Sequence, residues 1–398
     1  MKKRQRLLFI TTRFGRGTGG LGVSAERIVG YFRSHYDIHV LTQSPDLFEV
    51  ETAESHALGL SITHLKPQRD LKLQLQQVND WVCAETVREP VACVLGFYLG
   101  PWSYAGLLAA RRFAVPFAGF ARGNDIDLDL FGEAAFQAQY LLAHANRIFC
   151  VTTELEQKVK GFVPEATTQF IPNGVDPIQF PLLAATTPHA DHVIGIFGDI
   201  KQKKGLSLLL QRLDFQSYQL RIVGTVRDDT AKLVHGFLTL HPDLASRITQ
   251  VPFIKNLRDL LAEYAKCDVI CIPSSHEGMS NVMLEAMSCG KLVLASRVGG
   301  ALDVIESGKN GFLFDPAQPE TFDTQLHHAT TLAPQTKSNV GQAAREHIAA
   351  RFNWELERTR YLEAIAELKR EVLDKSQKAS DYTHATTKFS APAADTLV

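Results

Sequence analysis

The sequence lacks several features that mark other classes of protein. Its formal net charge is only −1, because 42 lysines and arginines nearly balance 43 aspartates and glutamates. Nucleic acid is therefore not expected as the main partner, since phosphate backbones demand a clear basic excess. The six cysteines form no C-x-x-C pair, and the 14 histidines show no metal-ligand spacing. A zinc or disulfide framework is not expected, and a reducing cytoplasm is the predicted location.

Long apolar runs are also missing. One uncharged stretch must still be considered as a possible membrane-spanning helix. Residues 91–110 carry no charge over about twenty residues, the length of a bilayer span. Gly96, Gly100 and Pro101 interrupt this stretch, which divides well into a strand over 91–95 and a helix that begins at Tyr104. We therefore expect no spanning helix and leave open a peripheral contact with the inner face of the membrane.

The length of 398 residues favours two domains. Short apolar runs alternate with helical periodicity, which is typical of parallel sheets with crossover helices. This alternation stops at the turn-rich segment 172–177 and the aperiodic segment 180–190, and it restarts at Val193. We predict an α/β protein with two doubly wound, Rossmann-like domains over residues 1–180 and 190–350.

The predicted elements can be placed along the chain. The strands are expected at 7–12, 38–42, 91–95, 116–120 and 148–151, and then at 193–197, 219–223, 269–273, 292–295 and 312–314. A helical pattern begins at Trp354 and predicts a C-terminal helix within 351–374. Residues 375–398 are rich in Ser, Thr and Ala with little apolar mass, which predicts a disordered tail.

The segment 268–290 is the most informative part of the chain. A predicted strand ends at Pro273, and a helix begins near Asn281 and stops at Gly290. Ligands of open parallel sheets bind beyond the carboxyl ends of the strands, and the loop with Glu277 lies there. This loop is therefore a candidate ligand site.

The beginning of that helix favours an anion, because free amide N–H groups and the positive end of the dipole meet there. Gly278 allows a ligand to approach the backbone closely. Glu285 lies one turn into the helix, where its carboxylate can accept hydrogen bonds from the two hydroxyls of a ribose. Glu277 lies where a sugar would hang from the phosphates. From these residues alone, a solvated loop acid at Glu277 and a surface charge at Glu285 explain the pattern equally well.

A longer motif favours the ligand site. Residues 277–300, EGMSNVMLEAMSCGKLVLASRVGG, resemble the donor-site signature of the retaining family 4 glycosyltransferases, with seven residues between two glutamates and then L-E-A-M-x-x-G. Residues 308–316, GKNGFLFDP, look like the family's G-x-x-G-x-L-x-x-P. Residues 197–205, FGDIKQKKG, look like its loop G-R-L-x-x-x-K-G, whose lysine maps onto Lys204. The resemblance covers about residues 5–370.

Other segments resemble the same family. Residues 170–176, FIPNGVD, look like its linker entry, and residues 19–22, GGLG, resemble the glycine loop that approaches the donor phosphates and the acceptor. Residues 122–125, RGND, lie where many members carry H-G-x-D. Two departures stand out, since Asp199 replaces the usual arginine after Gly198 and Arg122 replaces the usual histidine.

The resemblance implies a GT-B architecture in which the last helix crosses back to the N-terminal domain. It implies transfer of a sugar from a nucleoside-diphosphate sugar to a hydroxyl acceptor (a glycan, lipid or small molecule), with retained configuration and without a metal or other cofactor. The implied catalytic residues are Glu277, Lys204 and Arg122. The implied donor-binding residues are Gly20, Gly198, Lys201, Gly278, Met279, Ser280, Asn281 and Glu285. Lys201 stands among them as the substitute for the absent arginine, and a solvated lysine is the alternative.

Two other functions stay open at this point. A sugar-nucleotide epimerase uses the same fold, although its pattern of glutamate, histidine and aspartate is not evident. A non-catalytic sugar-nucleotide-binding subunit would fit the departures at Asp199 and Arg122, and turnover of a labelled nucleotide sugar would separate it from an enzyme. The sequence does not predict the sugar, the base, the acceptor or the oligomeric state.

Overall fold

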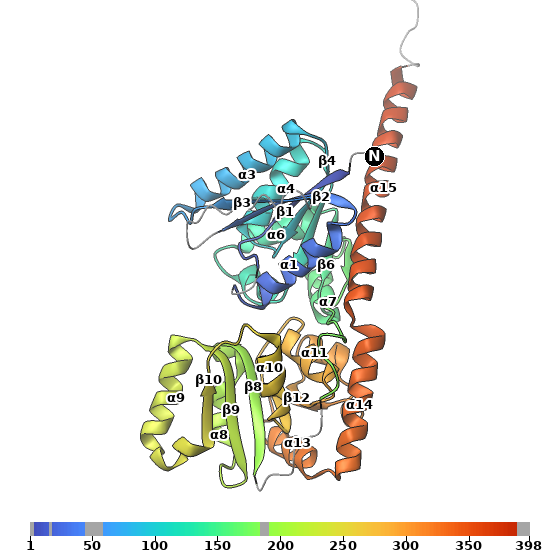
Figure 1. Ribbon diagram of the computed structural model, residues 1–398. Helices are drawn as coiled ribbons and strands as arrows, with labels where there is room; N and C mark the ends of the chain where they lie inside the picture. Colours follow the sequence, from blue (N-terminus) through green and yellow to red (C-terminus); the bar gives the residue numbers. More distant parts are fainter. Residues whose placement is uncertain (1–3, 16–17, 44–58, 184–190, 388–398) are drawn as a thin grey trace, which may run out of the picture.

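The computed structural model describes residues 4–15, 18–43, 59–183 and 191–387. Two separate parallel sheets, each with helices on both faces, lie one above the other beside the long helix α15 (Trp354–Thr387) (Figure 1). The predicted α/β fold with two Rossmann-like domains is therefore confirmed. Parts of the predicted linker (184–190) and of the predicted tail (388–398) lie outside the described residues.

The N-terminal sheet has the strand order β3-β2-β1-β4-β5-β6-β7, with every neighbouring pair parallel. Its strands are β1 (Gln5–Ile10), β2 (Tyr36–Gln43), β3 (Leu60–Leu65), β4 (Val91–Phe97), β5 (Phe117–Ala121), β6 (Arg147–Cys150) and β7 (Thr168–Phe170). Its helices are α1 (Gly20–Phe32), α3 (Leu71–Arg88), α4 (Pro101–Arg112), α5 (Asn124–Asp127), η1 (Asp129–Phe131), α6 (Ala135–His144) and α7 (Thr153–Phe162). The uncharged stretch 91–110 forms β4 and most of α4, and Leu95 and Leu107 are buried in the core. No helix of the described residues is long and apolar enough to cross a membrane.

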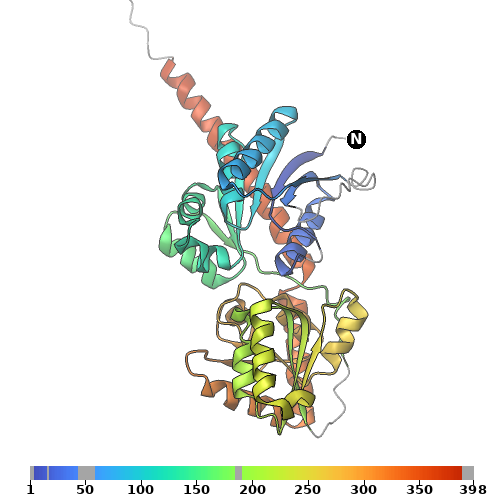
Figure 2. The same ribbon diagram turned by 90° about the vertical axis from the view of Figure 1, so that its left-hand side faces the viewer.

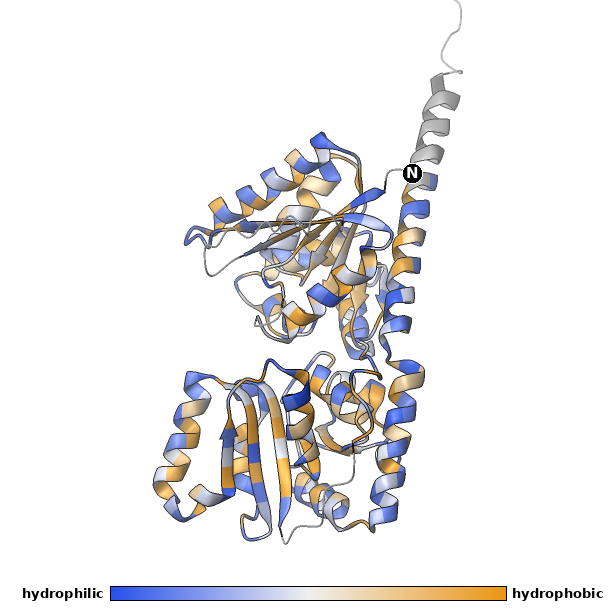
Figure 3. Ribbon diagram, in the orientation of Figure 1, coloured by the Kyte–Doolittle hydropathy of each residue, from blue (hydrophilic) through white to orange (hydrophobic). Residues whose placement is uncertain are grey.

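The C-terminal sheet has the strand order β10-β9-β8-β11-β12-β13 and is also parallel. Its strands are β8 (His192–Ile200), β9 (Tyr218–Val226), β10 (Ile248–Val251), β11 (Val269–Ile272), β12 (Leu292–Ser296) and β13 (Phe312–Phe314). Its helices are η2 (Gln202–Lys204), α8 (Leu206–Arg212), α9 (Asp228–Leu240), η3 (Pro242–Arg247), α10 (Leu257–Ala265), α11 (Asn281–Ser288), α12 (Gly300–Val304), α13 (Glu320–Thr331) and α14 (Pro334–Arg351). The outer helices carry polar and apolar residues side by side (Figure 3).

Helix α15 returns from the C-terminal domain and packs against the N-terminal one (Figures 1 and 2). Tyr361 is fully buried, and its ring centroid lies 5.4 Å from Phe120, 5.4 Å from Phe149 and 6.3 Å from Phe32. The helix extends to Thr387, beyond the predicted end at 374, because residues 354–387 contain neither proline nor glycine to stop it.

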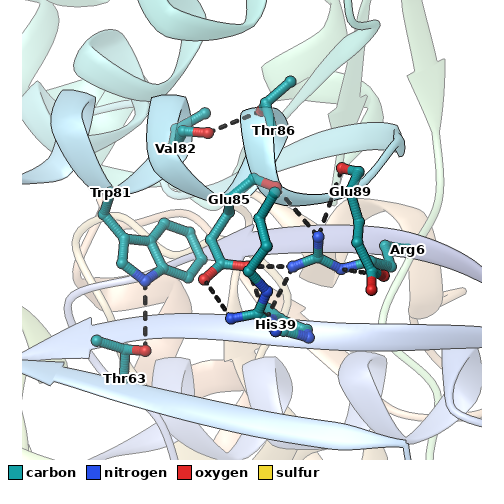
Figure 4. A network of polar contacts seen from close by, with 9 residues as sticks. Arg6, His39, Thr63, Trp81, Val82, Glu85, Thr86 and Glu89 are labelled. Atoms are coloured by element: carbon teal, nitrogen blue, oxygen red, sulfur yellow. Dashed lines mark hydrogen bonds and ion pairs between the residues drawn. The ribbon is translucent and has the colours of Figure 1, made fainter.

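A network of polar side chains fastens α3 to the amino end of the N-terminal sheet (Figure 4). The Arg6 guanidinium of β1 donates to the backbone oxygen of Glu85 (3.1 Å), pairs with the Glu85 carboxylate, and contacts Nδ1 of His39 at 3.2 Å. Burial and the nearby Arg6 lower the pKa of His39, so its neutral ring can accept that hydrogen bond. Trp81 donates to Thr63 of the edge strand β3 (3.3 Å). Arg6, at the centre of this network, lies near the amino end of β1, so we assign the network to stability.

The packing of α15 leads to a stability prediction. Tyr361→Ala should lower the free energy of unfolding by about 3–5 kcal/mol, because it leaves a cavity among three buried aromatic rings. The matched control Glu367→Ala changes an exposed residue of the same helix and should stay within about 0.5 kcal/mol of the wild type. Denaturant unfolding followed by circular dichroism measures both. Equal stabilities for the two variants would contradict the packing described.

Candidate functional site

The candidate site lies where the carboxyl ends of β8 and β11 meet. From β8 the chain continues to β9 on one side, whereas β11 lies on the other side, so the strand order reverses between them. Ligands of doubly wound sheets bind in the crevice at such a switch point. The loops that follow β1, β5 and β6 of the N-terminal domain face this edge. The site therefore lies between the domains.

A close backbone contact joins the two loops that follow β8 and β11. Gly205 has a φ of 74°, and a Cβ atom there would lie 1.9 Å from the backbone oxygen of Pro273, so only glycine fits. Next to it, the Ser275 amide donates to the backbone oxygen of Lys203 at 2.8 Å. These contacts hold the lysine-rich loop of residues 201–204 against the loop that carries Glu277.

Lys204 and Glu277 meet at the centre of the site. Their side chains form an ion pair with an Nζ–Oε2 distance of 2.5 Å, and they are 19% and 17% exposed. Ser274 Oγ donates to the same carboxylate oxygen at 3.1 Å. Burial alone would raise the pKa of Glu277, but Lys204, Lys203 and these hydrogen bonds outweigh burial and lower it. Glu277 is therefore a fixed anion that holds the Lys204 ammonium in place.

Glu285 is half-buried and forms no ion pair with any of the described residues. Its carboxylate accepts a hydrogen bond from Tyr264 (2.8 Å), and the Tyr264 ring stacks on Phe197 with centroids 4.5 Å apart. Burial raises the pKa of Glu285 to about 7. A carboxyl group with a raised pKa in a crevice between loops is typical of a ligand site.

Glycines bring the two domains into backbone contact beside Glu277. A Cβ atom on Gly278 would lie 2.3 Å from the backbone oxygen of Arg122, and one on Gly123 would lie 3.2 Å from the Gly278 amide nitrogen. Gly20, the first residue of α1, lies near Asn281, the first residue of α11, because a Cβ on Gly20 would be 3.7 Å from Asn281 Nδ2. The N-termini of two helices thus approach the same region, which favours an anion.

Several other predicted residues belong to this region. Ser280 caps α11 through a hydrogen bond from the Met283 amide at 3.4 Å, and a Cβ atom on Gly198 would lie 3.7 Å from Val282 of α11. Met279 is buried, with its sulfur close to Gly300, so its side chain packs inside the domain.

Asp199, which stands where the related family carries arginine, has two cationic partners. It forms a two-pronged ion pair with Arg227 (2.6 and 2.9 Å) and a second pair with Lys201 at 3.2 Å. Burial would raise the pKa of Asp199, but its bonds with Arg227 and Lys201 outweigh burial and lower it. The carboxylate is therefore compensated, and it leaves a net positive charge in this cluster.

Arg122 is not turned toward Glu277 and Lys204. Its guanidinium is buried, donates to Asn173 Oδ1 at 2.7 Å, and lies 4.9 Å from the centre of the Phe97 ring. The backbone oxygen of Arg122, and not its side chain, faces the donor loop at Gly278. These contacts fit a structural link between domains better than a part in the chemistry.

Four residues of the region were missed from the sequence. They are Asn173, Lys203, Arg227 and Tyr264. Lys203 reaches across the domain junction to Asn124 Oδ1 (2.8 Å). Arg227 follows the last residue of β9, so the rule that sites lie beyond the carboxyl ends of strands would have found it. Asn173 lies in the segment 170–176 that resembles the family's linker entry, whereas Tyr264 carries no comparable signal, because its partner lies far away in the chain.

Comparison with known proteins decides the class. The family model described as glycosyl transferases group 1 matches residues 191–331. An uncharacterized glycosyltransferase of Methanocaldococcus jannaschii is 21% identical over 345 residues, which cover 85% of this chain and 91% of that protein. The chain is a glycosyltransferase, and its residues 191–331 resemble those of group 1.

The sequence match to a further relative is shorter. The sulfoquinovosyl transferase of Arabidopsis thaliana is 40% identical over 146 residues, but these cover 34% of this glycosyltransferase and 28% of the plant protein. Sucrose-phosphate synthase from Thermosynechococcus elongatus has a TM-score of 0.79 at 19% identity, over 92% of this chain and 99% of that one. Anabaena HepE, solved with UDP-glucose, has a TM-score of 0.74 at 19% identity, over 92% and 100%. These likenesses confirm the expected GT-B fold.

The raised pKa of Glu285 leads to a prediction about stability. At pH 8, Glu285→Gln should stabilise this glycosyltransferase by about 1–3 kcal/mol, because it removes a buried charge whose folded-state pKa lies well above its unfolded value. The difference should shrink as the pH falls from 7 toward 4.5, where the wild-type carboxyl group takes up its proton in the folded state. Denaturant unfolding at a series of pH values measures both proteins. A difference that stays constant over this range would show that Glu285 has an ordinary pKa.

Proposed function

We propose that this glycosyltransferase moves a sugar from a nucleoside-diphosphate sugar to a hydroxyl acceptor, with retained configuration and without a metal ion. The observation that carries the proposal is the ion pair of Lys204 with Glu277 at the β8–β11 crevice, beside the N-terminus of α11. A diphosphate leaving group needs positive charge where its own charge develops. The crevice offers a lysine that is already held in place.

The chemistry follows from the leaving group. When the bond from the sugar to the diphosphate breaks, negative charge grows on the β-phosphate. Lys204 would neutralise this charge, and the N-termini of α1 and α11 would add their positive dipole ends. Such preorganised groups lower the barrier most, because they need no rearrangement during the reaction. The described residues contain no group of three or more His, Cys, Asp or Glu that could hold a metal ion.

The two glutamates are proposed to bind different parts of the donor. Glu277 would accept hydrogen bonds from the hydroxyls of the donor sugar, and Glu285 would accept those of the ribose. Anabaena HepE, which shares the fold, was solved with UDP-glucose, and this supports a nucleotide sugar as donor. Location in the cytoplasm and contact with its membrane remain predictions from the sequence.

We further propose that Lys201 takes the place of the missing arginine. Its pairing with Asp199 at 3.2 Å supports the idea that Asp199 orients a lysine. Since Arg227 also binds Asp199, the carboxylate need not pull Lys201 away from a phosphate. A lysine lacks the planar fork with which arginine grips two oxygens, so the substitution would weaken this contact without abolishing it.

A panel of nucleotide sugars tests the proposed function. One donor should stabilise the protein, and this stabilisation should grow with the logarithm of the donor concentration once that exceeds the Kd. In the presence of an acceptor, NMR should show a product with the anomeric configuration of the donor, at the same rate after exhaustive chelation. An inverted product would overturn the mechanism, and loss of transfer that manganese or magnesium restores would overturn the metal-independent form.

A series of lysine variants tests the phosphate site. Lys204→Ala should lower kcat roughly 10²–10³-fold, as expected for the loss of one preorganised donor. Lys201→Ala should cost roughly tenfold, since one charge-assisted hydrogen bond contributes about 1.5–3 kcal/mol. Lys203→Ala serves as the comparison in the same loop and should have the smallest effect. Full activity of Lys204→Ala, or a larger loss for Lys203→Ala than for Lys201→Ala, would show that this loop is wrongly assigned.

A further inference from the structure

Asn173, at the entry to the linker between the domains, makes hydrogen bonds in two directions. It is 2% exposed. Its Oδ1 accepts from Arg122 of the N-terminal domain at 2.7 Å. Its Nδ2 donates to the backbone oxygen of Met279 (3.2 Å) and to Oδ1 of Asn281 (3.0 Å), both in the C-terminal domain. One buried amide thus joins the two domains.

The next residue, Gly174, is held by the N-terminal side. Its amide donates to Glu357 of α15 at 2.9 Å, and its oxygen accepts from Trp354 Nε1 at 2.8 Å. Glu357 is 1% exposed and is itself bound by Arg27 (2.9 and 3.1 Å) and Tyr31 (2.9 Å) of α1. A buried carboxylate with these partners cannot move without leaving charges unpaired. The backbone at residue 174 is therefore a fixed point of the N-terminal domain.

On the other side, Asn173 holds the loop that carries the candidate site. Met279 and Asn281 flank Ser280, the cap of α11, and they follow Glu277 by two and four residues. Hydrogen bonds weaken steeply as they bend or lengthen. A shift of this loop therefore strains the bonds of Asn173 unless the N-terminal domain shifts with it. The position of the donor loop and the angle between the domains are linked through one side chain.

We propose that Asn173 is a positioning residue that couples the donor loop, residues 277–281, to the N-terminal domain through Arg122. Binding of a nucleoside diphosphate at this loop then changes the position of the N-terminal domain. This inference rests on the proposed function, since it takes the loop to bind the donor. It also explains the buried guanidinium of Arg122, which acts through Asn173 and does not touch the sugar.

Small-angle X-ray scattering of the full chain with UDP, GDP or ADP tests the coupling without any transfer. The nucleotide that stabilises the wild type most should change its radius of gyration. Asn173→Ala should bind that nucleotide within about fivefold of the wild-type Kd, because Lys204 and Glu285 remain. The radius of gyration of this variant should nevertheless change much less than that of the wild type when the nucleotide binds, and its kcat should fall about tenfold or more. Asn339→Ala, at an exposed asparagine of α14, is the matched control and should behave as the wild type.

A double-mutant cycle separates coupling from a local structural role. Arg122→Met should show the same loss of radius change and of kcat as Asn173→Ala, and the double variant should be no worse than either. If Asn173→Ala does not fold, Asn173→Ser and Asn281→Ala remove the bonds singly. The coupling would be overturned if these variants showed the full wild-type change in radius of gyration. It would also be overturned if the loss of kcat in the double variant equalled the product of the losses in the two single variants.

The failure of the proposed function gives a different result. If the wild type binds none of the three nucleotides, the proposed function is wrong. The coupling is then tested in the protein without a ligand. Asn173→Ala should broaden the distribution of interdomain distances there, because the tether is gone. An unchanged distribution would overturn the role of Asn173.

Discussion

The contact between the loops after β8 and β11 is the constraint on which the site depends. A Cβ at position 205 would lie 1.9 Å from the backbone oxygen of Pro273, so the chain must carry glycine there and the loops must lie directly against each other. Lys204, the preceding residue, is then forced into the range of Glu277, with 2.5 Å between nitrogen and oxygen. The charges of this pair are preorganised by the backbone, and they cost the protein no rearrangement when a ligand arrives.

Close backbone contacts also join the two domains. Glycines at 123 and 278 allow backbone to touch backbone, and Gly20 brings α1 toward the beginning of α11. Around these contacts the described residues form polar links, such as Lys203 to Asn124 and Glu154 to the amide of residue 299. Domains joined in this way are expected to move relative to each other. The buried cluster of Glu357 with α1 and the linker gives such a motion a fixed pivot.

The sequence allowed much of this fold to be predicted, and the exceptions share a physical cause. Interior strands such as β5, β11 and β12 are buried along their whole length and stand out as short hydrophobic runs. The missed strands β3, β7 and β10 all lie at sheet edges, where part of each strand is exposed and polar residues interrupt the run. For the site, the motif around Glu277 and Glu285 could be recognised because its residues are close in the chain. The direction of Arg122 and the partners of Glu285 depend on contacts between distant segments, which no local pattern contains.

The central claim is that a nucleotide diphosphate is bound between the N-termini of α1 and α11 by Lys204. A crystal structure of the protein with an intact nucleotide sugar tests it most directly. The account predicts the β-phosphate within hydrogen-bond distance of Lys204 Nζ, the ribose hydroxyls on Glu285, and the sugar on Glu277. A diphosphate bound away from Lys204, or a ribose that does not touch Glu285, would contradict it.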